Sequence, residues 1–307
     1  MKHYRNLRLV VIAALSLSTS LPASQSVASL NGTDAKNSTF AVGFTYKDDG
    51  ISRICSGALI APRIILTAAH CVINPLGSYG SDYIFLPPKT AIDSALDPKK
   101  ILPKPIQFFV PLDYKTTNGG SINDVAFIYL DKALATSGFR KIASVEEIGK
   151  IETTTSASAY GFGANFESNT EYSPFATQFK FDWNSRIPSQ ESANVFDFIS
   201  TTTVACKGDS GSPVTAKVQG GEEKIVAVVS GTAAIEGSCG AKTDDGFFHV
   251  KASFADPYLS LLGNLYNPAV IFAPPKPVIK KITCVKGKIK KIVTGISPKC
   301  AAGYKKV

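Results

Sequence analysis

Between residues 38 and 252 the chain consists of short runs of β-branched and aromatic residues, separated by clusters of Gly, Pro, Asn, Asp and Ser. Long helical patterns do not alternate with these runs, and no fixed repeat period occurs. The pattern predicts an all-β sandwich or barrel. Examples of the predicted strands are Phe40–Tyr46, Gly57–Ile60, Ile64–Leu66, Val125–Leu130, Ser156–Tyr160, Lys224–Val229 and Phe247–Val250.

A single helix is expected after this region, over Asp256–Leu265. Asp256 can cap its N-terminus and Pro257 suits its first turn. Leu259 and Leu262 lie on one face at helical spacing, which predicts that this face packs on the strands.

The composition limits the class of protein. Of 307 residues, 44% are hydrophobic and 19% are charged, which suits a domain with a sizeable core and excludes general disorder. Six cysteines are too few for a fold held by disulfides alone. After the N-terminus no run approaches the roughly 18 apolar residues of a membrane span. No cofactor motif and no metal-ligand spacing occurs, so neither a cofactor nor a metal is expected.

The N-terminus has the order of a secretory signal peptide. Three basic residues within the first eight precede the apolar stretch Leu9–Leu17, and small residues follow. Cleavage after Ala23 and cleavage after Ala28 are both open. The second is preferred because Ser26 and Ala28 stand at the small-residue positions. Residues 1–28 are therefore predicted to be a signal peptide, and the mature protein is expected to be secreted.

The C-terminus is basic. Residues 258–307 hold 10 lysines and no Asp or Glu, whereas the chain between the signal peptide and this tail holds 20 basic and 24 acidic residues. Residues 273–278 form a Pro-rich linker, and residues 279–307 a module that is too small for its own core. One disulfide between Cys284 and Cys300 is the expected support.

This charge favours attachment to an anionic cell-envelope surface or polymer, while a merely solvated tail is the alternative. The module also resembles short lysine-rich C-terminal modules of secreted bacterial proteins. Nucleic acid is not expected as a partner, because Tyr304 is the single aromatic residue available for stacking.

Three segments carry the residues of nucleophilic catalysis: Thr67–Cys71 (TAAHC), Asn123–Ala126 (NDVA) and Gly208–Pro213 (GDSGSP). A serine hydroxyl is a weak nucleophile at neutral pH and needs a base, usually a histidine that a carboxylate orients. One of the three histidines lies in the predicted signal peptide, which leaves His70 and His249 as candidate bases. Glycines around a serine allow amide N–H groups to converge on a developing oxyanion.

Each segment alone also has a purely structural interpretation. Asp124 can cap a strand, and Gly-Asp-Ser-Gly is commonly a turn. His70 beside Cys71 could be a metal ligand, although no further cluster at zinc spacing exists. His249 lies in a strand-like run and is predicted to be structural.

Together, the order His, Asp, Ser and these local strings resemble the trypsin/chymotrypsin family of serine endopeptidases over about residues 29–266. The strings Cys55–Ile60 and Gly161–Gly163 extend the resemblance, although the family usually has Gly-Trp-Gly at the second. The resemblance implies an all-β fold of two antiparallel six-stranded β-barrels with a C-terminal helix. The small basic disulfide-stapled module would follow a protease domain over residues 29–272.

The resemblance implies that Ser210 is the nucleophile, that His70 is the general base and then acid, and that Asp124 is the buried carboxylate that orients it. The backbone N–H groups of Gly208 and Ser210 would form the oxyanion hole. Two disulfides are implied, with a third pair left for the tail: Cys55–Cys71, Cys206–Cys239 and Cys284–Cys300.

In this family the acidic residue before the nucleophile, here Asp209, pairs with a new α-amino group that proteolysis creates. Ser29–Gly32 resembles the mature start of the family, although Ser29 is not the usual apolar first residue. We hypothesise that signal cleavage after Ala28 itself yields the active N-terminus and the ion pair between Asp209 and Ser29.

The resemblance places the floor of the primary specificity pocket at Val204. An uncompensated cation there would be strongly disfavoured, so an apolar rather than a basic P1 residue is expected. The walls are expected from Ser230, Gly231, Thr232 and Gly246.

The sequence thus predicts a secreted serine endopeptidase that hydrolyses protein or peptide substrates through an acyl-enzyme. The alternative is a catalytically silent binding protein on the same fold, held to anionic surfaces by its basic tail.

Overall fold

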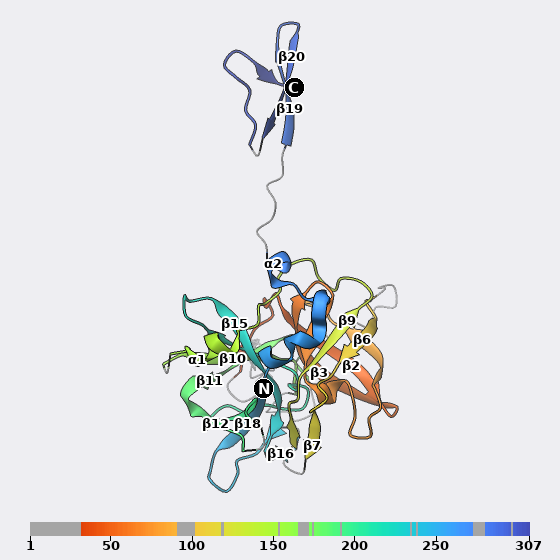
Figure 1. Cartoon of the computed structure of the whole chain (residues 1–307), viewed down its shortest axis with the longest axis vertical. Coiled ribbons are helices and arrows are strands. Elements are labelled where there is room, and N and C mark those ends of the chain that lie inside the picture. The colour runs from red at the N-terminus through yellow and green to blue at the C-terminus, as the bar shows by residue number, and fades with distance from the viewer. Residues whose placement is uncertain are drawn as a thin grey trace, which may run out of the picture.

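The computed structural model describes residues 32–90, 102–117, 120–152, 154–164, 172–173, 175–190, 192–233, 235–237, 239–272, 280–295 and 297–307. The predicted signal peptide, Ser29 and the predicted linker lie outside these residues. Two curled antiparallel sheets form the body of the protein, one on each side of the view in Figure 1. The all-β fold of two half-barrels is therefore confirmed.

The N-terminal sheet has the six strands that were expected. A two-residue turn, Asp49 and Gly50, joins its two longest strands with positive φ at both positions (46° and 81°), which matches the right-handed twist of a hairpin. Phe44, Leu59 and Phe85 are fully buried in its core. In spatial order the strands are β5 (Ser81–Phe85), β2 (Ala41–Asp48), β3 (Ile51–Ala61), β4 (Ile64–Thr67), β9 (Ala126–Leu130) and β6 (Pro105–Phe109).

The second sheet has eight strands rather than six, because two short strands extend its edges. Its core is rich in aromatic residues, among them Trp183, Phe196 and Phe198. In spatial order the strands are β1 (Thr33–Asp34), β11 (Thr177–Asp182), β10 (Ser156–Gly161), β14 (Pro213–Lys217), β15 (Glu223–Thr232), β18 (Phe248–Phe254), β13 (Val195–Ser200) and β12 (Arg186–Pro188).

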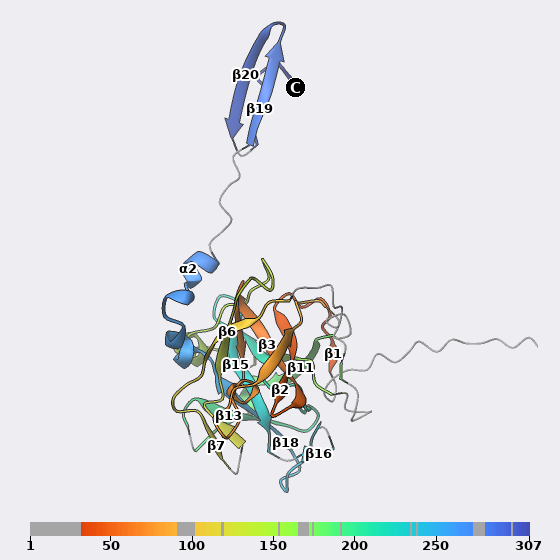
Figure 2. The ribbon, with the colours of Figure 1, turned by 90° about the vertical axis from the view of Figure 1, so that its right-hand side faces the viewer.

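The expected helix is present as the 3-10 helix η4 (Asp256–Leu265), which packs where the two sheets meet. Figure 2 shows it in blue at one side of the body, leading to the short helix α2 (Pro268–Ile271). Leu262 is buried there with Phe40 of the N-terminal half and Val228 of the second sheet. The predicted cap was wrong. The Asp256 carboxylate instead accepts the Val145 N–H (3.0 Å) at the start of helix α1 (Val145–Gly149), another helix end with a free donor.

Shorter elements connect these parts: η1 (Ala69–Cys71), β7 (Lys115–Thr117), β8 (Gly120–Ile122), η3 (Trp183–Ser185), β16 (Ile235–Glu236), β17 (Cys239–Gly240) and α2 (Pro268–Ile271). Among the residues in the ranges given above, no helix has the length and apolar character needed to cross a bilayer.

The C-terminal module is a separate three-stranded antiparallel sheet in the order β20 (Ile289–Gly295), β19 (Lys280–Lys286), β21 (Lys305–Lys306). The expected disulfide between Cys284 and Cys300 is present, and Cys284 is buried. This bond joins the middle strand to the chain that returns from β20.

Candidate active site

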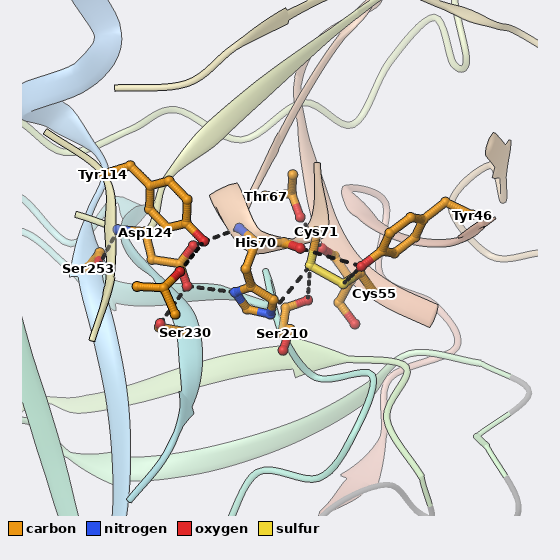
Figure 3. Close-up of polar contacts among 12 residues, drawn as sticks. Tyr46, Cys55, Thr67, His70, Cys71, Tyr114, Asp124, Ser210, Ser230 and Ser253 are labelled. Carbon is orange, nitrogen blue, oxygen red and sulfur yellow. Dashed lines mark hydrogen bonds and ion pairs between the residues drawn. A yellow bond between two sulfur atoms is a disulfide. The ribbon is translucent and has the colours of Figure 1, made fainter. Parts of the chain in front are cut away.

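The topology brings His70 and Asp124 to one end of the N-terminal sheet. His70 lies in η1, which follows β4, and Asp124 lies two residues before the start of β9. Because β4 and β9 are antiparallel neighbours, with Thr67 opposite Ala126, the residues after one strand lie beside those before the other. Ser210 comes from the other half of the molecule, in the turn before β14. Figure 3 shows the three side chains converging.

Asp124 and His70 form a close pair. The Asp124 side chain is 0% exposed and that of His70 is 28% exposed, and Asp124 Oδ2 lies 2.6 Å from His70 Nδ1. The backbone N–H of His70 donates to Asp124 Oδ1 (2.9 Å), and Ser230 Oγ donates to Oδ2 (2.5 Å). A buried carboxylate is costly unless donors surround it, so these bonds hold Asp124 ionised and fix the imidazole.

The same contacts shift both pKa values. Burial alone would lower the pKa of His70, but the charge of Asp124 and its hydrogen bond outweigh burial and raise it. Burial alone would raise the pKa of Asp124, but His70 and the hydrogen bonds from His70 and Ser230 lower it.

We therefore expect activity and stability to depend on pH in opposite directions. Because a general base must be neutral, kcat/KM should rise with pH, with its midpoint above 6.5, the usual value for histidine. The raised pKa stabilises the fold fully below pH 6.5, and this contribution declines as pH rises through the folded-state pKa of His70. Initial rates and urea unfolding, measured at pH values below and above 6.5, check the direction of the pH dependence of activity and of stability. A midpoint at or below 6.5 would contradict the assignment.

Ser253 and Ser230 support the pair in ways that the sequence did not reveal. Ser253 is fully buried and accepts the backbone N–H of Asp124 (3.2 Å), while Ser230, which also lines the cleft with Ser210, donates to the carboxylate. Ser253 lies three residues beyond the predicted strand Phe247–Val250, because β18 extends to Phe254, so the predicted strand gave no signal for it.

Ser210 and His70 line one cavity of about 480 Å³, which runs between the two halves of the molecule. Lining residues from the N-terminal half include Arg53 and Ile54, and those from the second half include Gly208 and Gly231. The nucleophile candidate and the base candidate are therefore both open to a substrate in this cleft.

The turn before Ser210 directs two backbone N–H groups toward the cleft. The Lys207 carbonyl accepts the Ala164 N–H (2.7 Å), and the Asp209 carbonyl accepts the Ser212 N–H (2.9 Å). In a trans peptide the N–H points opposite to the carbonyl, so the N–H groups of Gly208 and Ser210 point away from these internal partners. Gly208 has φ +97°, the left-handed value that the third position of a type II turn requires. This arrangement is suited to binding an oxyanion.

Position 211, directly after the candidate nucleophile, requires a glycine for two physical reasons. Its φ is +82°, and a Cβ there would lie 2.2 Å from the Ser56 carbonyl oxygen. The backbone of the nucleophile turn therefore packs directly against β3.

Ser56 of β3 fastens this turn to the N-terminal sheet. Its N–H donates to the Ser210 carbonyl (2.8 Å), and its hydroxyl donates to the Gly208 carbonyl (2.7 Å) and accepts the Phe162 N–H (2.9 Å). The side chain is 0% exposed. One hydroxyl thus connects the two segments that orient the candidate oxyanion hole.

We expect Ser56→Ala to lower kcat about tenfold or more and to change KM less than about threefold, because donors act mainly on the transition state. Steady-state kinetics on a peptide substrate check this split. Ser158→Ala, which removes another buried serine hydroxyl that accepts a side-chain hydrogen bond (from Gln178, 2.9 Å), is the control and should leave kcat unchanged. Equal effects of the two variants on kcat would contradict the role of Ser56.

Asp209 is fully buried behind this turn. It accepts the N–H groups of Gly163 and Cys206 (both 2.9 Å), and burial outweighs these bonds and raises its pKa to about 7. Ser29, its expected partner, lies outside the described residues.

The structure contains the two disulfides expected in the protease region, Cys55–Cys71 and Cys206–Cys239. The sulfur atoms of Cys55 and Cys71 lie close to the His70 ring. Because they are bonded to each other, they offer no thiolate to a metal. His249 lies apart from this group and pairs with Asp245 (2.8 Å), as a structural residue would.

A second, smaller cavity of about 90 Å³ opens beside Ser210, with Ala205, Gly231, Thr232 and Ile235 in its lining. Val204 does not line it: the side chain is fully buried and packs behind Gly240 of the cavity wall. Gly246 is also not part of the wall and lies exposed in a turn. The residue paired with Thr232 across the sheet is Val250, which the sequence did not indicate because the register was unknown.

A histidine–carboxylate pair and a serine, set where two curled antiparallel sheets meet, define the class of trypsin-like serine peptidases. The trypsin family model matches residues 29–256. Coagulation factor XII of Cavia porcellus is 26% identical over 225 residues, which is 66% of this chain and 36% of that protein. The chain thus spans little more than a third of the length of this relative. It belongs to the trypsin family of serine peptidases.

Proposed function

We propose that the protein is a serine endopeptidase that cleaves peptide bonds with Ser210, His70 and Asp124. The observation that carries this proposal is that the buried Asp124 holds His70 in one cleft with Ser210, beside two N–H groups that have no hydrogen-bond acceptor among the described residues. Membership of the family supports protein substrates.

In this mechanism Ser210 Oγ attacks the substrate carbonyl carbon, and its proton passes to His70 Nε2. The carbonyl oxygen becomes an oxyanion that accepts hydrogen bonds from the N–H groups of Gly208 and Ser210. The tetrahedral intermediate expels the amine, which takes the proton from His70 and leaves an acyl-enzyme. Water then repeats the sequence and releases the acid, while Asp124 holds the imidazole and stabilises its charged form.

A fluorophosphonate probe tests this proposal, because it reacts with an activated serine. Mass spectrometry should find the adduct on Ser210, and His70→Ala should abolish it. The absence of an adduct on the folded mature protein would overturn the proposal and favour the alternative, a catalytically silent binding protein.

We also propose a small or medium apolar P1 residue. The cavity of about 90 Å³ is smaller than the engineered cavity of about 150 Å³ that holds benzene. Among the described residues that line it there is no carboxylate to pair with a lysine or an arginine.

Peptides with Ala or Val at P1 should therefore show kcat/KM about 100-fold above peptides with Phe, Lys or Arg. Thr232→Gly should enlarge the cavity and raise the relative rate for Phe by about tenfold. A P1 series assayed with both proteins checks this. Faster cleavage after Lys or Arg than after Ala would disprove the assignment of this pocket.

We further propose that Asp209 pairs with the α-amino group of Ser29, which signal cleavage after Ala28 creates. The buried Asp209 carboxyl has backbone donors but no cation among the described residues, and its pKa of about 7 shows how costly its charge is. N-terminal sequencing of the secreted protein should give Ser29, and any other start would overturn this activation route.

We propose a protease domain over residues 29–272 and a basic module over residues 279–307 that holds the secreted protein to an anionic surface. Deletion of residues 274–307 should then abolish retention on such a surface and leave peptide cleavage unchanged. Retention that survives the deletion would contradict this role.

A further inference from the structure

The sheet of the C-terminal module has two unlike faces. Residues directly opposite each other in an antiparallel pair point to the same side, and alternate residues point to opposite sides. The register pairs Val285 with both Lys290 and Lys305, and Lys281 and Ile292 belong to the same side. We call this side, which carries Lys281, Val285, Lys290, Ile292 and Lys305, the open face.

The opposite side, here called the covered face, carries Cys284. Its disulfide with Cys300 brings the returning chain onto this side. The Lys291 ammonium lies 5.5 Å from the centre of the Tyr304 ring, and a Cβ on Gly303 would lie 3.4 Å from Lys286 Nζ. The returning segment therefore packs on the covered face.

The open face is basic and carries one strongly exposed apolar side chain, Ile292 of the edge strand β20. Ile292 is 71% exposed, and Lys281, Lys290 and Lys305 are exposed around it. Within the described part of the module none of these lysines forms an ion pair, and residues 280–307 contain no Asp or Glu. No acidic side chain in the described part of the module would repel an anionic partner from this face.

The combination of charge and exposed isoleucine selects among anionic partners. A soluble polyanion satisfies the lysines but leaves Ile292 in water. The surface of an anionic bilayer satisfies both, because lysines bind the headgroup region and an apolar side chain enters the interfacial zone. We propose that the open face docks on an anionic lipid surface, an inference that rests on the proposed surface-attachment role of the module.

The test is sedimentation of the full mature chain with vesicles of phosphatidylcholine containing roughly 30% phosphatidylglycerol, a strongly anionic surface, at about 0.15 M salt. The triple variant Lys281→Gln, Lys290→Gln, Lys305→Gln should lower the partition coefficient about 100-fold, at about fivefold for each lysine. Lys280→Gln, Lys286→Gln, Lys306→Gln removes the same charge from the covered face and should lower it less than about tenfold.

A second pair of variants tests the role of the exposed isoleucine. Ile292→Ser should weaken binding about fivefold or more, whereas Ile289→Ser, on the covered face and 55% exposed, should have little effect. The mass of the Cys284–Cys300 peptide without reduction shows that each variant keeps its disulfide.

The outcomes separate the two proposals. Equal losses of vesicle binding in both triple variants would overturn the assignment of the open face as the binding surface and leave attachment by charge alone. Binding to soluble polyphosphate but not to vesicles would overturn the assignment of a lipid surface as the partner and leave a polyanion in its place. Binding to neither would overturn both the inference and the attachment role.

Discussion

Replacing Ser210 with alanine is expected to lower kcat for peptide hydrolysis by about 10⁵- to 10⁶-fold. The reason is that the acyl-enzyme route requires the Ser210 oxygen, while the oxyanion donors and substrate binding alone retain only a small residual rate. Single-turnover hydrolysis of a peptide with alanine at P1 measures this loss.

Ser212→Ala is the matched control, because it removes a serine hydroxyl two residues away that is fully buried. It should keep kcat within about fivefold, since this hydroxyl does not reach the cleft. Residual activity of Ser210→Ala above about 1% of the wild-type rate would contradict the role of Ser210 as nucleophile.

Replacing Asp124 with asparagine is expected to lower kcat by about 10⁴-fold at neutral pH. The carboxylate oxygen 2.6 Å from His70 Nδ1 requires a proton on Nδ1, which leaves Nε2 free to act as a base. An amide N–H at this place would favour a proton on Nε2 instead, and the imidazole could not accept the proton of Ser210. Steady-state rates, with urea unfolding as a check on the fold, measure the effect.

Asp113→Asn provides the comparison. Asp113 lies near the site and accepts a hydrogen bond from the Asn123 side chain (3.0 Å), but it does not contact His70. This variant should keep kcat within about threefold. A loss from Asp124→Asn no larger than that from Asp113→Asn would show that Asp124 does not orient the base.

The sequence determined the fold class because each strand can be predicted from its own residues. The spacing of the β-branched runs requires only that each run bury one face, and the helix η4 and the Cys284–Cys300 pair were predicted from residues close together in the sequence. The pairs Cys55–Cys71 and Cys206–Cys239 were implied by the family resemblance. His70, Asp124 and Ser210 were found in the same way, because each lies in a short string with its own chemistry.

Properties that depend on register were not available from the sequence. Val250 rather than Gly246 lies opposite Thr232, and the two open and covered faces of the C-terminal sheet exist only once Val285 is paired with Lys290. A shift of one residue in either pairing would reverse every side chain, and no local pattern fixes that shift.

Contacts between distant segments were likewise decided by the tertiary structure alone. The residue type and position of Asp256 predicted a helix cap, yet its carboxylate accepts the N–H of Val145, 111 positions away. Ser56 reaches Gly208 across 152 positions and Ser253 reaches Asp124 across 129. A buried hydroxyl or carboxylate binds whichever donor or acceptor packing brings to it. The sequence therefore pointed to the residues that we propose carry the chemistry, and packing decided which residues hold them in place.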